Sequence, residues 1–421
     1  MIEFISTGHE VLTGEIVDTN SSWMAERLSQ EGLSLRAMYT VGDDLEDLVD
    51  LFQDRSQSKG FVVVNGGLGP TSDDLSAQAA AKAAGVDLVL EEAWVQQLKR
   101  KYQGRPMPSS NLKQAWLPAG ATWIDNPRGT ACGFHMMIGK RRFFFTPGVP
   151  SEMKAMVEAS ILPTLSAAIN PGQPKVMKRV FTFGLSEARV GEYVNRFATD
   201  GLDVGFRASF PLIQIKLRGD ETIIDKQLPD IRNELGDYIF CEDRGDAAAM
   251  IQDLMTERGH TLAMAESCTG GLVASTLVSR AGSSAYFLAS SVVYSDQMKC
   301  DLLGVRAETL RDFGAVSEEV AAEMALGILE RAGSDVSLAV SGVAGPGGGS
   351  EEKPVGTVAF ALSFRDDSGP VVRRQVLRFP PWDRGRIRHA SAMVCLDMLR
   401  RHLQSKTIVP HYDYAQRVSH N

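Results

Sequence analysis

The 421-residue sequence has no long apolar run, no excess of basic residues and no recognisable export signal. No window stays apolar over the roughly 18 residues that a membrane span needs. The first ten residues lack the basic-then-apolar order of a secretory signal. The formal net charge is −8, whereas nucleic-acid-binding surfaces are usually basic. These absences predict a cytoplasmic protein with no membrane and no nucleic acid among its partners.

Cysteine is also scarce, with five residues in the whole chain. They are scattered, and no two of them have the C-x-x-C spacing of a zinc or redox site. The cysteines are therefore expected to be reduced and structural.

What the sequence does contain is an alternation of apolar strands and helices. Residues 2–6 and 61–65 are predicted strands with helices between them, a pattern typical of an α/β domain with a mostly parallel sheet. Beyond the prolines near residue 170 the elements become short, which predicts a small α+β module. We expect a three-layer α/β domain over 1–170, the module over 171–245, a second α/β domain over 246–405 and a disordered tail over 406–421.

A nucleophile motif follows a predicted strand near residue 265. The segment ESCTGG, residues 266–271, should turn from that strand into a helix that begins at about Gly270. Such a junction directs free backbone N–H groups towards a ligand. Ser267 is thereby a candidate nucleophile, with N–H groups near Thr269 and Gly270 as an oxyanion hole and with Gly271 allowing close approach. The alternative is that Ser267 only caps the helix.

A tyrosine and a lysine occupy unusual positions in VVYSDQMKCDLLG, residues 292–304. If Ser295 is the N-cap of a helix that ends before Gly304, Tyr294 and Lys299 take the two positions of a hydrophobic staple and lie side by side. Because the helix dipole disfavours a positive charge in the first turn, Lys299 is a candidate neutral base for Ser267. The alternative is an exposed helix lysine.

A glycine-rich segment, VSGVAGPGGGSEEKPVG, occupies residues 340–356. Its N–H groups are suited to surround a phosphate, although the spacing is not that of a Walker A loop. A flexible surface loop is the alternative. Two arginines at a predicted helix entrance either pair with the phosphate or are solvated. The candidate substrate-binding residues here are Ser341, Gly342, Gly345, Gly348, Gly349, Arg384 and Arg388.

The N-terminal region has its own candidate nucleotide site in GGLGPTSDD, residues 66–74. Its glycines allow a tight turn against a phosphate or a pterin, and Thr71 and Ser72 are expected to cap the following helix. The aspartates would suit Mg²⁺ bridged to a pyrophosphate, or they only favour a helix N-terminus. The candidate residues are Gly66, Gly67, Gly69, Thr71, Asp73, Asp74 and Asn20, with Asp73, Asp74 and Glu10 as candidate metal ligands.

At these residues the sequence resembles a known family. ESCTGG, Y-S-x-x-x-K and GPGGGSEEKPVGT resemble the bacterial nicotinamide-mononucleotide (NMN) deamidase domain over about 246–403. The resemblance implies that Ser267, Tyr294 and Lys299 hydrolyse NMN to nicotinate mononucleotide and ammonia without a metal or other cofactor. Asp296 stands where Asn is usual and Gly347 where Asp is usual, and neither change removes a catalytic group. Asp296 favours a charged Lys299 and so opposes the helix dipole.

The N-terminal segments STGHEVLTGEIVDTN, NGGLGPTSDD, NPRGTACGF and TPGVPSEM resemble the molybdopterin-binding-like domain of the CinA family. With a KH-like module and the deamidase domain, the resemblance covers nearly the whole chain. It implies an ADP-ribose pyrophosphatase that depends on a divalent metal (Mg, Mn or Co) and on potassium, and it implies a homodimer. The module has no obvious GXXG clamp, which disfavours RNA binding.

The sequence thus predicts a bifunctional enzyme of pyridine-nucleotide salvage whose ligands are NMN and ADP-ribose. One alternative is that only one half is active and the other half is a scaffold. Another is a regulatory nucleotide- or pterin-binding protein related to competence. The intact Ser267, Tyr294 and Lys299 speak against the second alternative for the C-terminal half.

Overall fold

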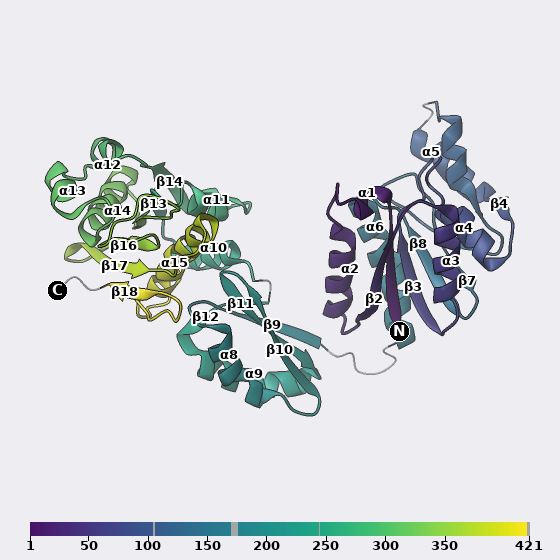
Figure 1. Ribbon diagram of the computed structural model, residues 1–421, viewed down its shortest axis with the longest axis horizontal. Coiled ribbons are helices and arrows are strands. Elements are labelled where there is room, and N and C mark those ends of the chain that lie inside the picture. The colour runs from purple at the N-terminus through teal and green to yellow at the C-terminus, as the bar shows by residue number, and fades with distance from the viewer. Residues whose placement is uncertain (104–105, 170–175, 244, 419–421) are drawn as a thin grey trace. The chain divides into compact units, whose positions relative to one another are not determined.

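The computed structural model describes residues 1–103, 106–169, 176–243 and 245–418 (Figure 1). It has two compact units, Met1–Met177 with Gly219–Glu221, and Lys178–Arg218 with Thr222–Asn421. The predicted boundary between residues 170 and 171 lies outside the described residues. The second unit contains both the small module and the C-terminal domain.

The N-terminal unit is built on a six-stranded sheet in the order β2-β1-β3-β8-β7-β6. Strands β2, β1, β3 and β8 are parallel, and β7 and β6 add an antiparallel edge. A separate antiparallel pair joins β4 to β5. The bounds are β1 Ile2–Thr7, β2 Leu35–Val41, β3 Gly60–Asn65, β4 Leu88–Leu90, β5 Trp116–Pro118, β6 Thr122–Ile124, β7 Gly133–Ile138 and β8 Arg141–Thr146.

Helices cover both faces of this sheet, as Figure 1 shows. Successive side chains of a strand point to opposite faces, so Phe143 and Phe145 enter one hydrophobic core while Phe144 enters the other. The result is the expected three-layer α/β sandwich. The helices are α1 His9–Leu12, α2 Thr19–Gln30, α3 Leu45–Arg55, α4 Ser76–Ala84, α5 Glu92–Tyr102, η1 Ser109–Ala115, α6 Pro150–Met156, η2 Val157–Ile161 and α7 Leu162–Ile169.

The small module is a four-stranded sheet in the order β10-β11-β9-β12 with two main helices. Leu228 and Ile231 lie one helical turn apart on α9 and are buried, which gives this helix the apolar stripe that packing requires. Its elements are β9 Val176–Thr182, α8 Glu187–Val194, η3 Asn195–Phe197, β10 Leu202–Ser209, β11 Leu212–Gly219, α9 Glu221–Leu235, η4 Gly236–Tyr238 and β12 Ile239–Glu242.

The C-terminal domain has a six-stranded sheet in the order β14-β13-β15-β16-β17-β18. Strand β13 is parallel to both β14 and β15, and the remaining strands pair antiparallel. The bounds are β13 Leu262–Glu266, β14 Phe287–Val292, β15 Val336–Gly342, β16 Thr357–Asp366, β17 Gly369–Arg378 and β18 Gln416–Val418.

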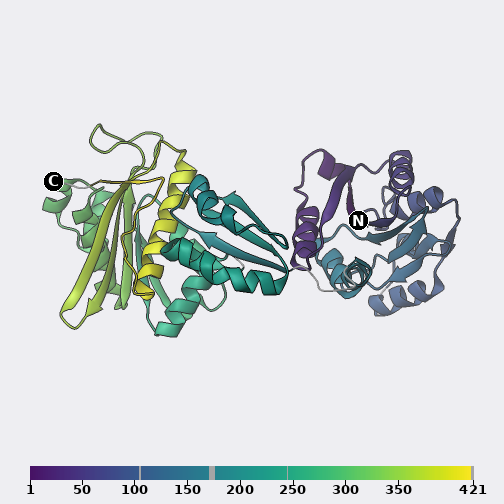
Figure 2. The same cartoon turned by 90° about the horizontal axis from the view of Figure 1, so that it is seen from below.

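Helices of this domain also lie on both faces of the sheet, and Figure 2 shows α15 running along one of them. Buried residues of α10, α11 and α15 share one core, while those of α14 form another. Within the described ranges, none of the helices combines the length and the apolar character that crossing a bilayer requires. The helices are α10 Ala247–Arg258, α11 Leu272–Val278, η5 Ser283–Ala285, α12 Asp296–Leu303, α13 Ala307–Phe313, α14 Glu318–Ala332 and α15 Arg384–Leu403.

The prediction of a disordered tail over 406–421 is wrong for residues 406–418; residues 419–421 lie outside the described part. Strand β18 pairs with β17, and Tyr412 is 1% exposed. The Tyr412 hydroxyl donates to the buried carboxylate of Asp397 at 2.9 Å, and its ring packs edge-on against Phe183 of the small module. Aromatic contacts and hydrogen bonds to residues outside the segment order it, and neither produces a periodic sequence pattern.

Candidate functional site

Three strand ends meet at the carboxyl edge of the C-terminal sheet. Because Glu266 on β13 is level with Val292 on β14 and with Val340 on β15, the residues that follow these strands lie close together. They include Ser267 and Tyr294, and Ser341 is the last residue but one of β15. Ligands of open α/β sheets bind at such an edge. A cavity of about 270 Å³ lies there.

The turn after β13 is organised by Glu266, a buried carboxylate. It accepts backbone hydrogen bonds from Gly271, Val273 and Ala274 at 2.9–3.2 Å, which satisfies the first turn of α11. This helix begins at Leu272, with Gly271 as its N-cap in a left-handed conformation. The expected start at Gly270 and the alternative role of Ser267 as a cap are therefore both wrong.

The predicted oxyanion donors also change. The Gly270 N–H is bonded to the Ser267 carbonyl at 3.1 Å, so it is not free for a ligand. In the part of the chain that the structure describes, the N–H groups of Cys268 and Thr269 have no hydrogen-bond acceptor. They directly follow Ser267 and are the better candidates for an oxyanion hole. Burial raises the pKa of the Cys268 thiol to about 12, which disfavours this thiol as a nucleophile.

Lys299 projects into the cavity from the first turn of α12. Ser295 is the N-cap of this helix, as predicted, and its hydroxyl accepts from the N–H of Met298. Lys299 is 1% exposed, so the alternative of an exposed helix lysine is wrong. Its Nζ is 3.5 Å from the carbonyl oxygen of Tyr294 and 3.5 Å from Oδ1 of Asp296. Both contacts are longer than most hydrogen bonds, and they hold the amine at the cavity wall.

The phenol of Tyr294 does not lie beside the Lys299 amine, as it was predicted to. The Tyr294 side chain is exposed, and its hydroxyl accepts a hydrogen bond from Arg384 at 2.8 Å. The second Arg384 nitrogen donates to the Gly345 carbonyl at 2.8 Å. Tyr294 contacts Lys299 through its main-chain oxygen instead. Arg384 therefore joins the strand end that carries Tyr294 to the glycine-rich loop.

The cavity brings together eight of the predicted residues, and five others lie outside its lining. The eight are Ser267, Tyr294, Lys299, Ser341, Gly342, Gly345, Gly348 and Arg384. Thr269, Gly270, Gly271, Gly349 and Arg388 are not among the lining residues. Arg388 binds the Thr269 carbonyl with two nitrogens, at 2.6 and 3.3 Å, and so fixes the turn that carries Ser267.

The N-terminal unit has a second cavity, of about 460 Å³, at the carboxyl edge of its own sheet. Acidic side chains dominate its polar lining, and they come from five separate positions in the chain. They are Glu10, Asp43, Asp73, Asp74 and Glu152. Gly66, Gly67 and Gly69 line it too, as predicted.

Electrostatics in this cavity favour a cation. Burial raises the pKa of Asp43, and the charges of Glu10, Asp73 and Asp74 raise it further. A hydrogen bond from the His9 N–H lowers it, but the net shift is upward. The main-chain N–H and the hydroxyl of Thr71 both donate to Asp74, just before the next helix. That helix begins at Ser76 without a side-chain cap, so the predicted capping by Thr71 and Ser72 is wrong.

Asn20 lies beside this cavity rather than in it. Its amide donates to the Asn65 side chain at 2.8 Å and to the Gly148 carbonyl at 2.7 Å. Asn65 in turn donates to the Pro147 carbonyl at 2.6 Å. This buried network joins the ends of β3 and β8 and fixes the loop at Gly148, so Asn20 supports the site without lining it.

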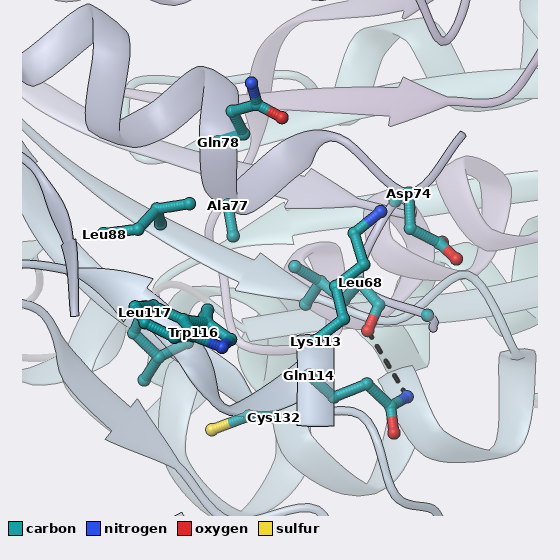
Figure 3. Close-up of a pocket in the computed structure, with 12 residues that line it drawn as sticks. Leu68, Asp74, Ala77, Gln78, Leu88, Lys113, Gln114, Trp116, Leu117 and Cys132 are labelled. Carbon is teal, nitrogen blue, oxygen red and sulfur yellow. Dashed lines mark hydrogen bonds between the residues drawn. The ribbon is translucent and has the colours of Figure 1, made fainter. Parts of the chain in front are cut away.

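A narrow side cavity of about 50 Å³ extends from the acidic one, and Figure 3 shows the residues around it. Gln114 lines both cavities and donates to the Leu68 carbonyl at 3.5 Å. Its side-chain oxygen is buried and, among the described residues, has no partner. The hydroxyl of Thr7, in the acidic cavity, is in the same state. Unpaired buried polar atoms at a cavity wall favour a polar ligand.

The predicted metal ligands fit an ion that is shared with a substrate, and they do not fit an ion held by protein side chains alone. Among the described residues, no three acidic, histidine or cysteine side chains are grouped closely enough to hold a metal alone. Mg²⁺ is commonly held by one or two carboxylates together with substrate phosphates and water. The acidic lining fits an ion shared with a pyrophosphate and does not fit an all-protein cage.

Comparisons with known proteins match the N-terminal and the C-terminal α/β domains to two separate family models. Residues 3–167 match the family described as "Probable molybdopterin binding domain", and residues 245–403 match the "CinA C-terminal domain". The CinA-like protein of Shewanella amazonensis is 43% identical over 423 residues, which is 99% of each chain. The chain belongs to the CinA family.

Two further relatives place the C-terminal site in context. The nicotinamide-nucleotide amidohydrolase PncC of Shewanella oneidensis is 43% identical over 425 residues, again 99% of each chain. The solved structure of the competence/damage inducible protein CihA from Agrobacterium tumefaciens is 42% identical, with a TM-score of 0.35. It covers 38% of this chain and 96% of its own. The predicted family and the predicted α/β fold class are thus confirmed.

Sequence reasoning missed several residues of the two sites. Glu266 ends an otherwise apolar strand, and a lone acid at such a place is the signal that could have identified it. Asp43 was interpreted as a helix cap in a capping box with Glu46, and this is wrong: Asp44 caps α3, and Asp43 lines the cavity. Thr7 and Gln114 carried no signal, because only the folded chain reveals that they lack partners.

Proposed function

We propose that the C-terminal domain is an amidohydrolase that converts NMN to nicotinate mononucleotide and ammonia. The observation that carries the proposal is a buried serine and a buried lysine lining one cavity at the carboxyl edge of the sheet. A neutral lysine can replace histidine as the base for a serine nucleophile. The name of the Shewanella oneidensis relative supports the substrate class.

In this proposal the Ser267 hydroxyl attacks the carboxamide carbon while Lys299 takes its proton. The C–N bond then breaks, and Lys299 returns the proton to the leaving nitrogen, which departs as ammonia. Water deprotonated by Lys299 cleaves the resulting ester and releases the carboxylate. In both halves of the reaction the oxyanion would accept hydrogen bonds from the N–H group of Cys268, next to Ser267, and from that of Thr269.

The 5′-phosphate of NMN is assigned to the far side of the cavity. Arg384 and the N–H groups of the glycine-rich loop provide a positive wall there. Tyr294 then acts mainly on Arg384 through its hydroxyl and on Lys299 through its carbonyl.

The test is ammonia release from NMN by the purified protein in EDTA, beside Ser267→Ala. Serine removal should lower the rate by at least about 10³-fold. The matched control is Ser279→Ala, an exposed serine at the end of α11. A parent that releases no ammonia while folded would refute the proposal and favour a regulatory nucleotide-binding role.

We also propose that the N-terminal unit hydrolyses ADP-ribose to AMP and ribose 5-phosphate. The acidic cavity supports this, because a divalent ion would relieve its negative charge and bridge a pyrophosphate. Glu10, Asp43, Asp73 and Asp74 are the residues placed to share Mg²⁺, Mn²⁺ or Co²⁺ with the substrate. Such an ion would stabilise negative charge on the pyrophosphate. The potassium requirement and the link to salvage belong to this proposal.

A further inference from the structure

Three arginines begin helix α15, although the dipole disfavours positive charge at a helix N-terminus. Arg384, Arg386 and Arg388 follow the N-cap residue Asp383. Two of them have partners in the amidohydrolase site, at Gly345 and Tyr294 for Arg384 and at Thr269 for Arg388. Arg386 is the exception, since it is bound outside the site.

Arg386 lies between two aromatic rings. Its guanidinium carbon is 4.5 Å from the ring centroid of Trp382 and 4.5 Å from that of Phe210. The two rings also contact each other edge to face, at 5.4 Å between centroids. Cation–π contacts of this kind offset the electrostatic cost of the charge at this position. The first turn of α15 is thus held by two aromatic residues that do not line the amidohydrolase cavity.

Phe210 belongs to the small module and not to the C-terminal domain. It lies in the turn between β10 and β11, and it is 40% exposed. Figures 1 and 2 both show α15 beside this module. Its ring makes specific contacts rather than facing solvent alone. One of these contacts is with the helix that carries Arg384.

The aromatic cluster also reaches the glycine-rich loop. Trp382 packs on Phe379 at 5.9 Å between centroids, and the Phe379 N–H donates to the Gly356 carbonyl at 2.9 Å. Gly356 is bonded to Val343 at the other end of the loop. A side chain at position 356 would come within 2.5 Å of the Phe379 oxygen, so the approach is close. The aromatic cluster of Phe210, Trp382 and Phe379 therefore borders the two proposed elements of the phosphate site, which are Arg384 and the glycine-rich loop.

We propose that the β10–β11 hairpin of the small module is a positioning element for phosphate recognition in the amidohydrolase site. Phe210 holds Arg386, and Arg386 fixes the turn of α15 that presents Arg384 to the phosphate. The proposal rests on the function proposed above for the C-terminal domain. It assigns the module a role in substrate recognition rather than in RNA binding or in chemistry.

The experiment compares Phe210→Ala, Arg386→Ala and Phe210→Tyr in the full chain, with NMN and nicotinamide riboside as substrates. The two alanine variants should raise the KM for NMN by roughly threefold to tenfold, the scale of one or two exposed cation–π contacts. Their kcat should stay close to that of the parent. Hydrolysis of the riboside, which has no phosphate, should not change, and Phe210→Tyr should behave as the parent does.

The matched control is Phe197→Ala. It removes a ring of the same module that contacts Arg196 at 5.1 Å and is not part of the aromatic cluster. Calorimetric binding of NMN to each protein separates the two proposals. A parent that neither binds nor hydrolyses NMN would refute the proposed function. A parent that does both, beside alanine variants that are folded and have an unchanged KM, would refute the positioning role. Equal losses with both substrates would also refute it.

Discussion

The two cavities occupy the same place in two different sheets and differ in charge, since only the N-terminal one is strongly acidic. Each lies where parallel strands end, which is where α/β folds bind ligands. The N-terminal cavity is lined by five carboxylates. The C-terminal one has a buried amine, two serine hydroxyls and a guanidinium, with Asp296 as its acidic residue. The fold thus determines where chemistry takes place, and the residues at the strand ends determine which chemistry it is.

This difference separates the reactions that the cavities can support. A carboxylate wall repels a pyrophosphate unless a cation lies between them. The C-terminal site holds its own candidate nucleophile and base, so the reaction proposed there draws on groups of the protein itself. Each prediction on activity below changes one cavity and should leave the other unaffected.

The largest effect is expected from Lys299→Met. It removes the proposed base while keeping the length of a buried side chain, so the fold should tolerate it. Ammonia release from NMN should fall by about 10²–10⁴-fold, the range for general bases. ADP-ribose hydrolysis should not change. Lys226→Met, at an exposed site on α9, is the control. Full amidohydrolase activity in Lys299→Met would exclude Lys299 as the base.

Glu10→Gln should affect only the N-terminal cavity. It removes one of the charges proposed to attract the metal, so the Mn²⁺ concentration for half-maximal ADP-ribose cleavage should rise by roughly 10–100-fold. A metal titration of AMP release measures this. Glu15→Gln, an exposed neighbour outside the cavity, serves for comparison. An unchanged titration would remove Glu10 from the set of candidate ligands.

Glu266→Gln should cause a smaller loss in the C-terminal domain. The amide group cannot accept all three backbone hydrogen bonds, so unfolding should become easier by about 1–3 kcal/mol. NMN turnover should fall as the turn after Ser267 loosens. Chemical denaturation and kinetics measure the two effects. Glu257→Gln, exposed on α10, is the control, and equal behaviour of the two variants would contradict the role of Glu266.

The smallest effect concerns acid stability. Burial lowers the pKa of His402 to about 4, and the charges of His260 and Arg258 act in the same direction. Because the unfolded side chain titrates near 6.5, stability from neutral His402 is complete above that pH and is lost as the pH falls towards 4. His402→Phe should make melting of the C-terminal unit less pH-dependent between 6.5 and 4. Identical pH profiles would contradict this.

The sequence was most informative where local rules determine the structure. The N-cap at Ser295 and the strand-end position of Ser267 follow from capping and strand patterns, and both are confirmed. The phenol of Tyr294, the donor group of Gly270 and the order of the tail were mispredicted. The phenol and the tail depend on partners outside their own segments, Arg384 for Tyr294 and Asp397 for Tyr412. The Gly270 N–H is instead taken up by the Ser267 carbonyl within the turn itself. The homodimer and the cytoplasmic location stay predictions.

The central claim is that the N-terminal cavity needs a metal ion and the C-terminal one does not. The most direct test assays ADP-ribose and NMN hydrolysis on one sample, with and without EDTA. We predict that EDTA abolishes AMP release from ADP-ribose and that added Mn²⁺ restores it. Ammonia release from NMN should be the same in both conditions, because Ser267 and Lys299 supply the nucleophile and the base. Loss of ammonia release in EDTA, or AMP release that persists in it, would contradict the account.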